Sequence, residues 1–174
     1  MTFTRFSTAT AALALMTAPA FADCGTVRFS DVGWTDITAT TAVASTVLGA
    51  LGYETEVLLL SVPVTFTSMA SGDIDVFLGN WMPTMEADIA PYREAGTVDT
   101  VRRNLAGAKY TLATNAAGAA LGISSFADIA THADVLESNI YGIEPGNDGN
   151  RLILDMIAQN AFGLEGFNVV ESSE

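Results

Sequence analysis

The sequence predicts an α/β fold with mainly parallel β-sheets. Short apolar segments that suit strands alternate with segments of helical periodicity along most of the chain, and this alternation is typical of parallel sheets joined by helices. A second observation is the segment 54–61, whose middle is nearly all apolar, as in a parallel strand buried on both faces. No internal repeat and no low-complexity linker interrupts the pattern.

The first half of the chain is predicted to contain three strands and three helices in alternation. The expected strands are 26–30, 54–61 and 74–78. The expected helices are 36–51, 63–70 and 84–94. The first helix has apolar residues near helical spacing and ends at Gly52, and Pro63 suits the first turn of the second. Thr84 is the expected cap of the third, with acidic residues in its first turns.

The second half is predicted to repeat the alternation after a crossover at Gly107-Ala108. The expected strands are 109–114, 139–143 and 167–170. The expected helices are 124–132, capped by Ser124, and 151–161, which has an apolar side. The small residues at 115–122 and the polar residues at 144–150 are predicted to form loops.

The N-terminus has the pattern of an export signal. Arg5 is the only charge in the first 22 residues, an apolar stretch surrounds residues 11–16, and Ala20-Phe21-Ala22 is a small-x-small cleavage motif. We expect cleavage between Ala22 and Asp23, and therefore an exported, periplasmic protein. The alternative is a retained anchor, but the apolar stretch is too short and too rich in alanine to hold a protein in a bilayer.

The C-terminus reads as unfinished. A predicted strand is followed by Glu171-Ser172-Ser173-Glu174, which resembles the cap of a helix that does not follow. Cys24, the only cysteine, suggests a disulfide partner in an absent C-terminal portion, because a lone cysteine in an exported protein is unusual. An ordinary buried thiol is the alternative.

Composition limits the classes of partner. Removal of residues 1–22 from the 174-residue chain leaves about 152, enough for one domain or two small lobes. The formal charge is −13, and loss of Arg5 with the signal makes it −14. Such an acidic protein does not suit nucleic acid or an anionic membrane surface. It suits a cationic ligand, although acidity also serves solubility alone.

The two tryptophans are the strongest site candidates. Trp34 and Trp81 each follow a glycine where a predicted parallel strand ends, and these ends meet at one edge of a sheet, where α/β folds bind ligands. Asp36 lies two residues after Trp34 at a helix start. Indole faces beside a carboxylate suit a quaternary ammonium ion. The alternatives are core packing for the tryptophans and a first-turn acid for Asp36, with Asp31 a weaker counter-charge.

Two further residues extend this candidate site from the second half. Tyr110 opens a predicted strand after the crossover and offers a third aromatic wall. The Asn147 amide and the backbone N–H groups of the 146–150 loop precede a helix and suit a ligand hydroxyl or carboxylate. An ordinary strand tyrosine and a capped helix start are the alternatives. The loop lacks the Gly-Lys-Ser/Thr of a phosphate loop.

Signals for catalysis and for metal binding are poor. His132, the single histidine, is predicted to end a helix at the surface. The sequence has no paired His/Cys metal spacing and no Gly-x-Ser-x-Gly. Asp73 and Asp75 fall on one face of a strand start, which is more often a solvated loop end than an acid pair. We therefore expect no catalytic residue, no metal and no cofactor.

Three motifs carry a resemblance to a known family. The stretches 25–36, 75–83 and 141–146 resemble the choline/glycine-betaine substrate-binding proteins of bacterial ABC importers, and within that family the periplasmic choline-binding members. The resemblance covers essentially the whole mature chain. Family members are about twice as long, and their chain returns to complete both lobes and adds another aromatic residue to the site.

The resemblance implies a two-lobed periplasmic-binding-protein fold of type II-like architecture, closing over ligand about a hinge near 105–109. The implied division is a signal at 1–22, lobe 1 at 23–107 and an incomplete lobe 2 at 108–174. It implies an aromatic box around trimethylammonium. The residues carried over are Trp34, Trp81, Tyr110, Asp36 and Asn147, with Asp36 near the cation or the choline hydroxyl and Asn147 at the polar end.

The function implied is capture of choline by a monomer and delivery to an inner-membrane ABC permease, rather than catalysis. Asp36 would repel the carboxylate of betaine, which favours choline. Three alternatives stay open: a glycine- or proline-betaine-binding protein of the same family, an exported hydrolase using Asp73, Asp75 or Asp36, and a sensory protein that presents the same ligand to a receptor.

Overall fold

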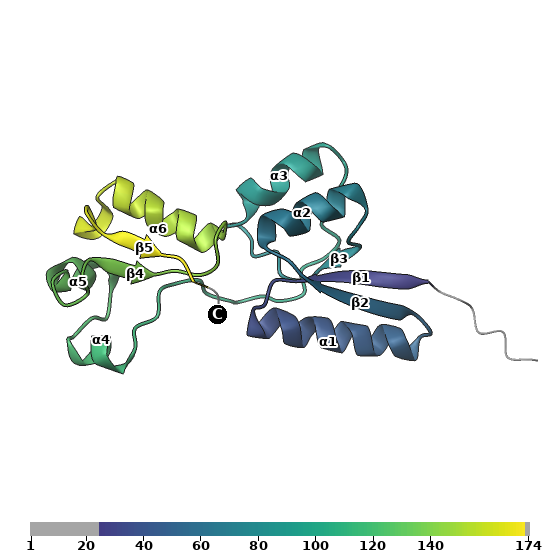
Figure 1. Cartoon of the computed structure of the whole chain (residues 1–174), viewed down its shortest axis with the longest axis horizontal. Helices are drawn as coiled ribbons and strands as arrows, with labels where there is room; N and C mark the ends of the chain where they lie inside the picture. The colour runs from purple at the N-terminus through teal and green to yellow at the C-terminus, as the bar shows by residue number, and fades with distance from the viewer. Residues whose placement is uncertain (1–24, 173–174) are drawn as a thin grey trace, which may run out of the picture.

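Two parallel β-sheets organise the computed structural model, which describes residues 25–172 (Figure 1). Helices accompany both sheets, so the predicted α/β class is confirmed. The predicted signal peptide with its cleavage site, Cys24 and the last two residues of the expected C-terminal cap lie outside the described residues.

The first sheet has the order β2-β1-β3, with β1 (Thr26–Asp31) between β2 (Glu54–Leu59) and β3 (Val76–Phe77). Both neighbours run parallel to β1. Phe29 is in register with Val57 on one side and Val76 on the other, so β1 and β3 point their carboxyl ends to the same edge. The two tryptophans follow these two strands, as the sequence predicted.

Three helices cover this sheet. In Figure 1, α1 (Thr35–Ala50) lies against one face, and α2 (Val62–Ser71) and α3 (Glu86–Glu94) lie on the other side. Proline stands in the first turn of α2, where its missing N–H costs nothing, and Gly72 ends the helix in the left-handed conformation. The α2–α3 side is held by buried apolar side chains, including Val62, Phe66, Met85 and Ile89.

The prediction that the second strand is buried on both faces is wrong. β2 is an edge strand, and its Val57 and Leu59 side chains are exposed. The neighbouring helix α1 likewise leaves Val43, Val47 and Leu51 exposed. An apolar run shows that a strand suits a nonpolar environment, but the number of neighbours depends on the sheet order, which the run does not contain.

The second sheet pairs β4 (Asn139–Tyr141) with β5 (Asn168–Val170) in parallel. Around it lie α4 (Ala116–Ala120), α5 (Phe126–Ile129), η1 (Ala130–His132), α6 (Asp148–Ala158) and η2 (Ala161–Gly163). Its core is separate from the first, and consists of Ile129, Ile140, Ile153, Leu164 and Phe167.

Two predictions for the second half are wrong. Residues 109–114 form no strand, because no described strand lies beside them to share a ladder. The segment 115–122 is not only a loop, since it contains α4. Asn115 caps that helix by accepting the Gly118 N–H at 2.9 Å, and four of the five helical residues are alanine, which strongly favours helix.

Helix starts also differ from the predicted ones. α3 begins after Met85, and the Thr84 hydroxyl instead donates to the Trp81 carbonyl oxygen. α5 begins after Ser125, whose capping box with Asp128 replaces the expected Ser124 cap. α6 begins at Asp148, three residues before the predicted start. For α5 and α6, local side-chain hydrogen bonds choose between neighbouring cap candidates that the sequence pattern cannot separate.

Residues 101–115 join the two sheets without regular secondary structure, and the predicted crossover and hinge fall within them. The exact division of the lobes between residues 107 and 108 stays a prediction. Within residues 25–172, no helix has both the length and the apolar character that crossing a bilayer requires.

We expect Phe66→Ala to lower the free energy of unfolding by about 3–5 kcal/mol. Phe66 is buried and packs edge-on against Phe77 at 5.8 Å and stacked on Tyr92 at 6.0 Å, so its loss leaves a cavity in the first core. Val64→Ala, an exposed position on the same helix, is the control and should change stability by less than about 0.5 kcal/mol. Urea denaturation measures both, and equal effects would contradict the central place of Phe66 in the core.

Candidate functional site

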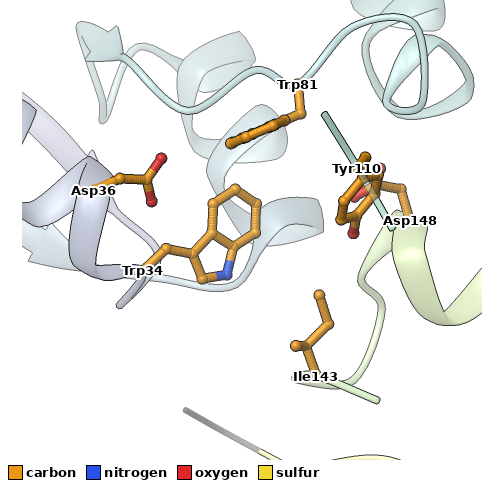
Figure 2. A pocket seen from close by; sticks show the side chains of 6 residues that line it. All are labelled: Trp34, Asp36, Trp81, Tyr110, Ile143 and Asp148. Atoms are coloured by element: carbon orange, nitrogen blue, oxygen red, sulfur yellow. The ribbon is translucent and has the colours of Figure 1, made fainter. Parts of the chain in front are cut away.

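A pocket lies where the carboxyl edge of the first sheet meets the start of α6. It has a volume of about 170 Å³ and is lined by Trp34, Asp36, Trp81, Tyr110, Ile143 and Asp148 (Figure 2). Four of the five site residues predicted from the sequence therefore line one cavity. They come from segments up to 76 positions apart (110 − 34), which the fold brings together.

The two tryptophans are held by different local structures. Trp34 is the residue before α1, and Gly33 turns the chain between β1 and that helix with a φ of +87°, which favours glycine. The Trp34 ring is 9% exposed and packs on the first core. Trp81 follows β3, and its backbone N–H donates to the Met85 sulfur at 3.3 Å while its backbone carbonyl accepts from the Thr84 hydroxyl at 2.9 Å. These bonds hold the Trp81 backbone, and its partly buried ring packs against the first core.

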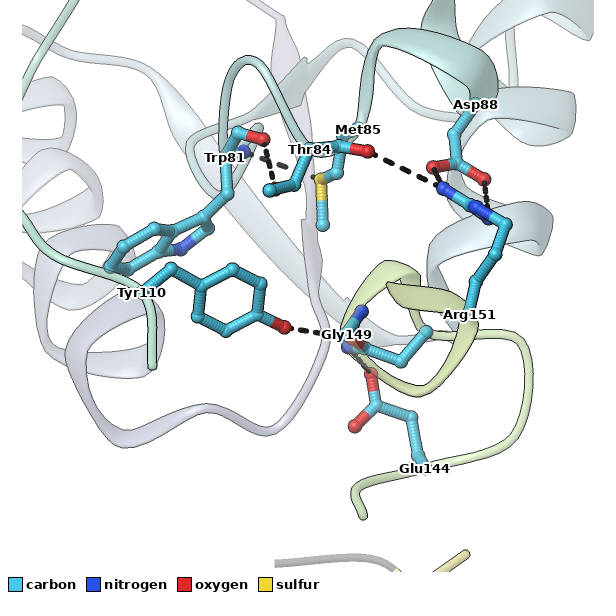
Figure 3. Close-up of polar contacts among 9 residues, drawn as sticks. Trp81, Thr84, Met85, Asp88, Tyr110, Glu144, Gly149 and Arg151 are labelled. Carbon is cyan, nitrogen blue, oxygen red and sulfur yellow. Dashed lines mark hydrogen bonds and ion pairs between the residues drawn. The ribbon is translucent and has the colours of Figure 1, made fainter. Parts of the chain in front are cut away.

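Tyr110 forms a third wall from the joining segment rather than from a strand. Its ring lies 5.8 Å from that of Trp81, inclined by 36°, and its hydroxyl donates to Asn147 Oδ1 at 3.2 Å (Figure 3). Tyr110 is 45% exposed, and the partial burial of its phenol raises its pKa to about 12, with help from the Asp148 and Glu144 carboxyls. The phenol is therefore protonated at neutral pH and serves as a hydrogen-bond donor.

Glu144 links Trp34 to the second half of the chain. The indole N–H donates to both carboxylate oxygens of Glu144, each at 3.2 Å. Glu144 also accepts from the Asn147 side-chain amide at 2.8 Å. The sequence pattern places Glu144 in a polar loop and indicates no role for it. Its signal was present in the motif 141–146, but a partner 110 positions away is a property of the tertiary structure.

Asn147 lies behind the pocket rather than among its lining residues. It is 2% exposed, and its Oδ1 accepts the Gly149 N–H at 2.7 Å as the cap of α6 as well as the Tyr110 hydroxyl. Its contact with the ligand stays a prediction. In this arrangement, the Asn147 side chain positions Tyr110 and Glu144.

Two carboxyl groups line the pocket from opposite sides. Asp36 lies in the first turn of α1 and is exposed, whereas Asp148, the first residue of α6, is 1% exposed. Burial raises the pKa of the Asp148 carboxyl, a larger effect than the lowering caused by the Thr84 hydroxyl. The sequence pattern does not indicate Asp148 as a site residue, because it predicts a helix start at Arg151 and a loop at residue 148.

A salt bridge joins the two halves beside the pocket. Arg151 of α6 contacts Asp88 of α3 through both terminal nitrogens, at 2.8 and 3.2 Å, and donates to the Thr84 carbonyl at 3.4 Å (Figure 3). The Asp88 side chain is only 14% exposed, so this pair is less screened by water than a surface pair.

The remaining acidic candidates are engaged elsewhere. Asp75 holds Arg28 in a bidentate pair that lowers the pKa of its carboxyl, and Asp73 accepts from the Ser71 hydroxyl. Asp31 accepts the Gly33 N–H at 2.8 Å. None of the three lines the pocket. Among residues 25–172, no group of three or more metal-ligating side chains is close enough to hold an ion.

A second cavity of about 300 Å³ lies on another side of Trp34. It is lined by Val32, Gly33, Trp34, Leu59, Leu60, Ser61 and Glu144. Only Trp34 is shared between the two cavities. The first cavity combines three aromatic rings with two carboxyls, and this composition suits a small organic cation stabilised by ring faces and a counter-charge.

Comparison with known proteins agrees with this chemistry. Residues 25–174 match the family described as the substrate binding domain of ABC-type glycine betaine transport system. The chain therefore belongs to this family of transport-associated binding domains, which is a class of binding proteins and not of enzymes.

Solved structures add detail. The chain is 75% identical to an ABC-transporter choline binding protein in complex with choline, over 87% of this chain and 52% of that one, with a TM-score of 0.81. The chain also matches an ABC-transporter choline binding protein in its unliganded semi-closed conformation, with a TM-score of 0.76 and the same identity and coverage. The chain thus spans about half the length of these proteins. An uncharacterized protein ORF1 of Chromohalobacter salexigens is 53% identical over 140 residues, 80% of this chain and 90% of that protein.

The raised pKa of Tyr110 predicts a specific loss of stability in alkali. Because the phenol has a pKa of about 12 in the folded chain and 10.0 when free, the stability due to its protonated form is present below pH 10 and is lost as the pH rises towards 12. Urea denaturation from pH 8 to 11 should show a smaller fall for Tyr110→Phe than for the wild type. Parallel curves for the two proteins would contradict the partial burial of this hydroxyl.

Proposed function

We propose that this protein is a periplasmic substrate-binding protein that captures choline in an aromatic box and delivers it to an ABC importer. The observation that carries the proposal is the convergence of Trp34, Trp81 and Tyr110 on one pocket beside Asp36. A relative with 75% identity binds choline, which supports the same ligand class here.

The physical basis of this proposal is that a trimethylammonium group has no hydrogen-bonding atoms. It has no N–H to donate, so its recognition depends on ring faces, cavity shape and nearby negative charge. Each well-placed ring contributes about 0.5–2 kcal/mol, more where water is excluded. Trp34 and Trp81 would contact the methyl groups from the first half of the chain, and Tyr110 from the second.

Choline is favoured over betaine by the carboxyl groups in the pocket. Betaine carries a carboxylate where choline carries a hydroxyl, and Asp36 would repel that carboxylate while it attracts the cation. Asn147, through its unused amide hydrogen, would assist at the polar end. Glycine betaine is the second candidate, because the family description names it.

Delivery would follow closure of two lobes, 23–107 and 108–174, about a hinge at 105–109. Trp34–Glu144 and Arg151–Asp88 join residues of opposite lobes and would stabilise the closed form. In this proposal the signal is cleaved after Ala22, the mature protein is a monomer, and its partner is a permease in the inner membrane.

The test is calorimetric titration of the mature chain with choline, glycine betaine and proline, with the choline-binding relative titrated in parallel. We expect saturable binding of choline, and Trp81→Ala should weaken it about tenfold or more, because one wall of the box is lost. Calorimetry is preferred to fluorescence here, since the variant also loses one of the two fluorescent reporters.

Tyr141→Ala is the matched control. Tyr141 is an aromatic side chain that is 73% exposed and lies outside the pocket, so its loss should leave the choline Kd unchanged. If the relative binds choline while the folded mature chain binds no quaternary amine, the proposal is wrong for this chain.

A further inference from the structure

The Asp148 carboxyl is a buried acidic group in the pocket that the protein itself leaves partly without hydrogen bonds. Its Oδ2 atom is buried, and no described residue donates to it. The side chain as a whole is 1% exposed and lines the pocket. A buried carboxylate oxygen without a donor is unfavourable, so a donor on the ligand would gain more here than one placed against a solvated group.

The donors close to Asp148 leave its Oδ2 atom without a partner. The Thr84 hydroxyl and the backbone N–H of Asp148 lie close enough to lower the pKa of the carboxyl, but Thr84 has a single proton, which also serves the Trp81 carbonyl oxygen at 2.9 Å. The Tyr110 hydroxyl donates to Asn147, and the Arg151 guanidinium donates to Asp88 and to the Thr84 carbonyl. A donor that completes the hydrogen bonding of Asp148 would therefore come from the molecule in the pocket.

The position of Asp148 differs from that of Asp36. Figure 2 shows the two carboxyls on opposite sides of the tryptophan rings, with Asp148 beside Tyr110. Asp36 is exposed, so water can donate hydrogen bonds to its oxygens, whereas Asp148 is shielded from water. Asp36 is therefore suited to long-range attraction of a cation, and Asp148 to a short, directional contact with one end of the ligand.

We propose that Asp148 is a specificity-determining residue that accepts a hydrogen bond from the ligand hydroxyl, so that the pocket selects a short quaternary ammonium alcohol. The inference rests on the proposed function and adds the group that recognises the polar end of the ligand. A ligand with a methyl group in place of the hydroxyl would leave Oδ2 without a donor. A ligand with a carboxylate there would bring two negative charges together.

The experiment compares choline with propyltrimethylammonium, in which a methyl group replaces the hydroxyl. Both Kd values are measured by calorimetry for the wild type, Asp148→Ala, Asp148→Asn and Asp155→Asn. Asp155 is an exposed acid on the same helix, so its variant controls for loss of one negative charge. Circular dichroism melting establishes that each variant is folded.

We expect the wild type and Asp155→Asn to prefer choline by about 10- to 100-fold, the value of a hydrogen bond to a charged group. Asp148→Ala should reduce that preference to within about threefold, mainly because it raises the Kd for choline. Asp148→Asn, which keeps an acceptor oxygen without the charge, should give an intermediate ratio.

Other results separate the possible failures. If the wild type binds no choline, the proposed function fails, and this inference fails with it. If choline binds and Trp81→Ala weakens it, but the wild type does not distinguish the two ligands, only the role of Asp148 is wrong. That role is also wrong if Asp148→Ala raises the Kd values of both ligands by the same factor. If Asp148→Ala does not fold, the wild-type ratio and Asp148→Asn decide.

Discussion

The site depends on the parallel pairing of β1 with β3. This pairing aligns Phe29 with Val76 and points both strands to one edge, so the loops that follow them bring Trp34 and Trp81 to the same pocket. An antiparallel pairing would place the two indoles at opposite edges. The turn at Gly33 before α1 and the Met85 and Thr84 contacts of Trp81 then hold the backbone at both tryptophans.

Contacts between the two halves give the pocket its remaining walls. The Trp34 indole N–H and the Asn147 amide both donate hydrogen bonds to Glu144. Asn147 also accepts a hydrogen bond from the Tyr110 hydroxyl. Two of the three rings are thus connected through one chain of hydrogen bonds that crosses between the sheets. A change in the relative position of the halves would alter the orientation of these rings together, which would be the physical route from ligand binding to the proposed closure.

The pocket also concentrates negative charge in an unusual way for a buried site. Asp148 is shielded from water, Glu144 is shared between two donors, and the nearest cation, Arg151, is directed to Asp88. Buried carboxyls without a compensating cation are costly, so their presence is understandable where a cationic ligand supplies the missing charge. The net charge of −13 acts in the same direction at longer range.

The sequence by itself determined the fold class and most of the strands and helices, and it singled out Trp34, Asp36, Trp81 and Tyr110 as candidates, because periodicity and the residues at strand ends are local properties. Only the tertiary structure decided that β2 is an edge strand, that residues 109–114 form no strand, and that α6 begins at Asp148. It also brought Glu144 to Trp34 and placed Asp148 in the pocket. These features depend on which segments become neighbours and on how deeply each group is buried, and sequence spacing contains neither quantity.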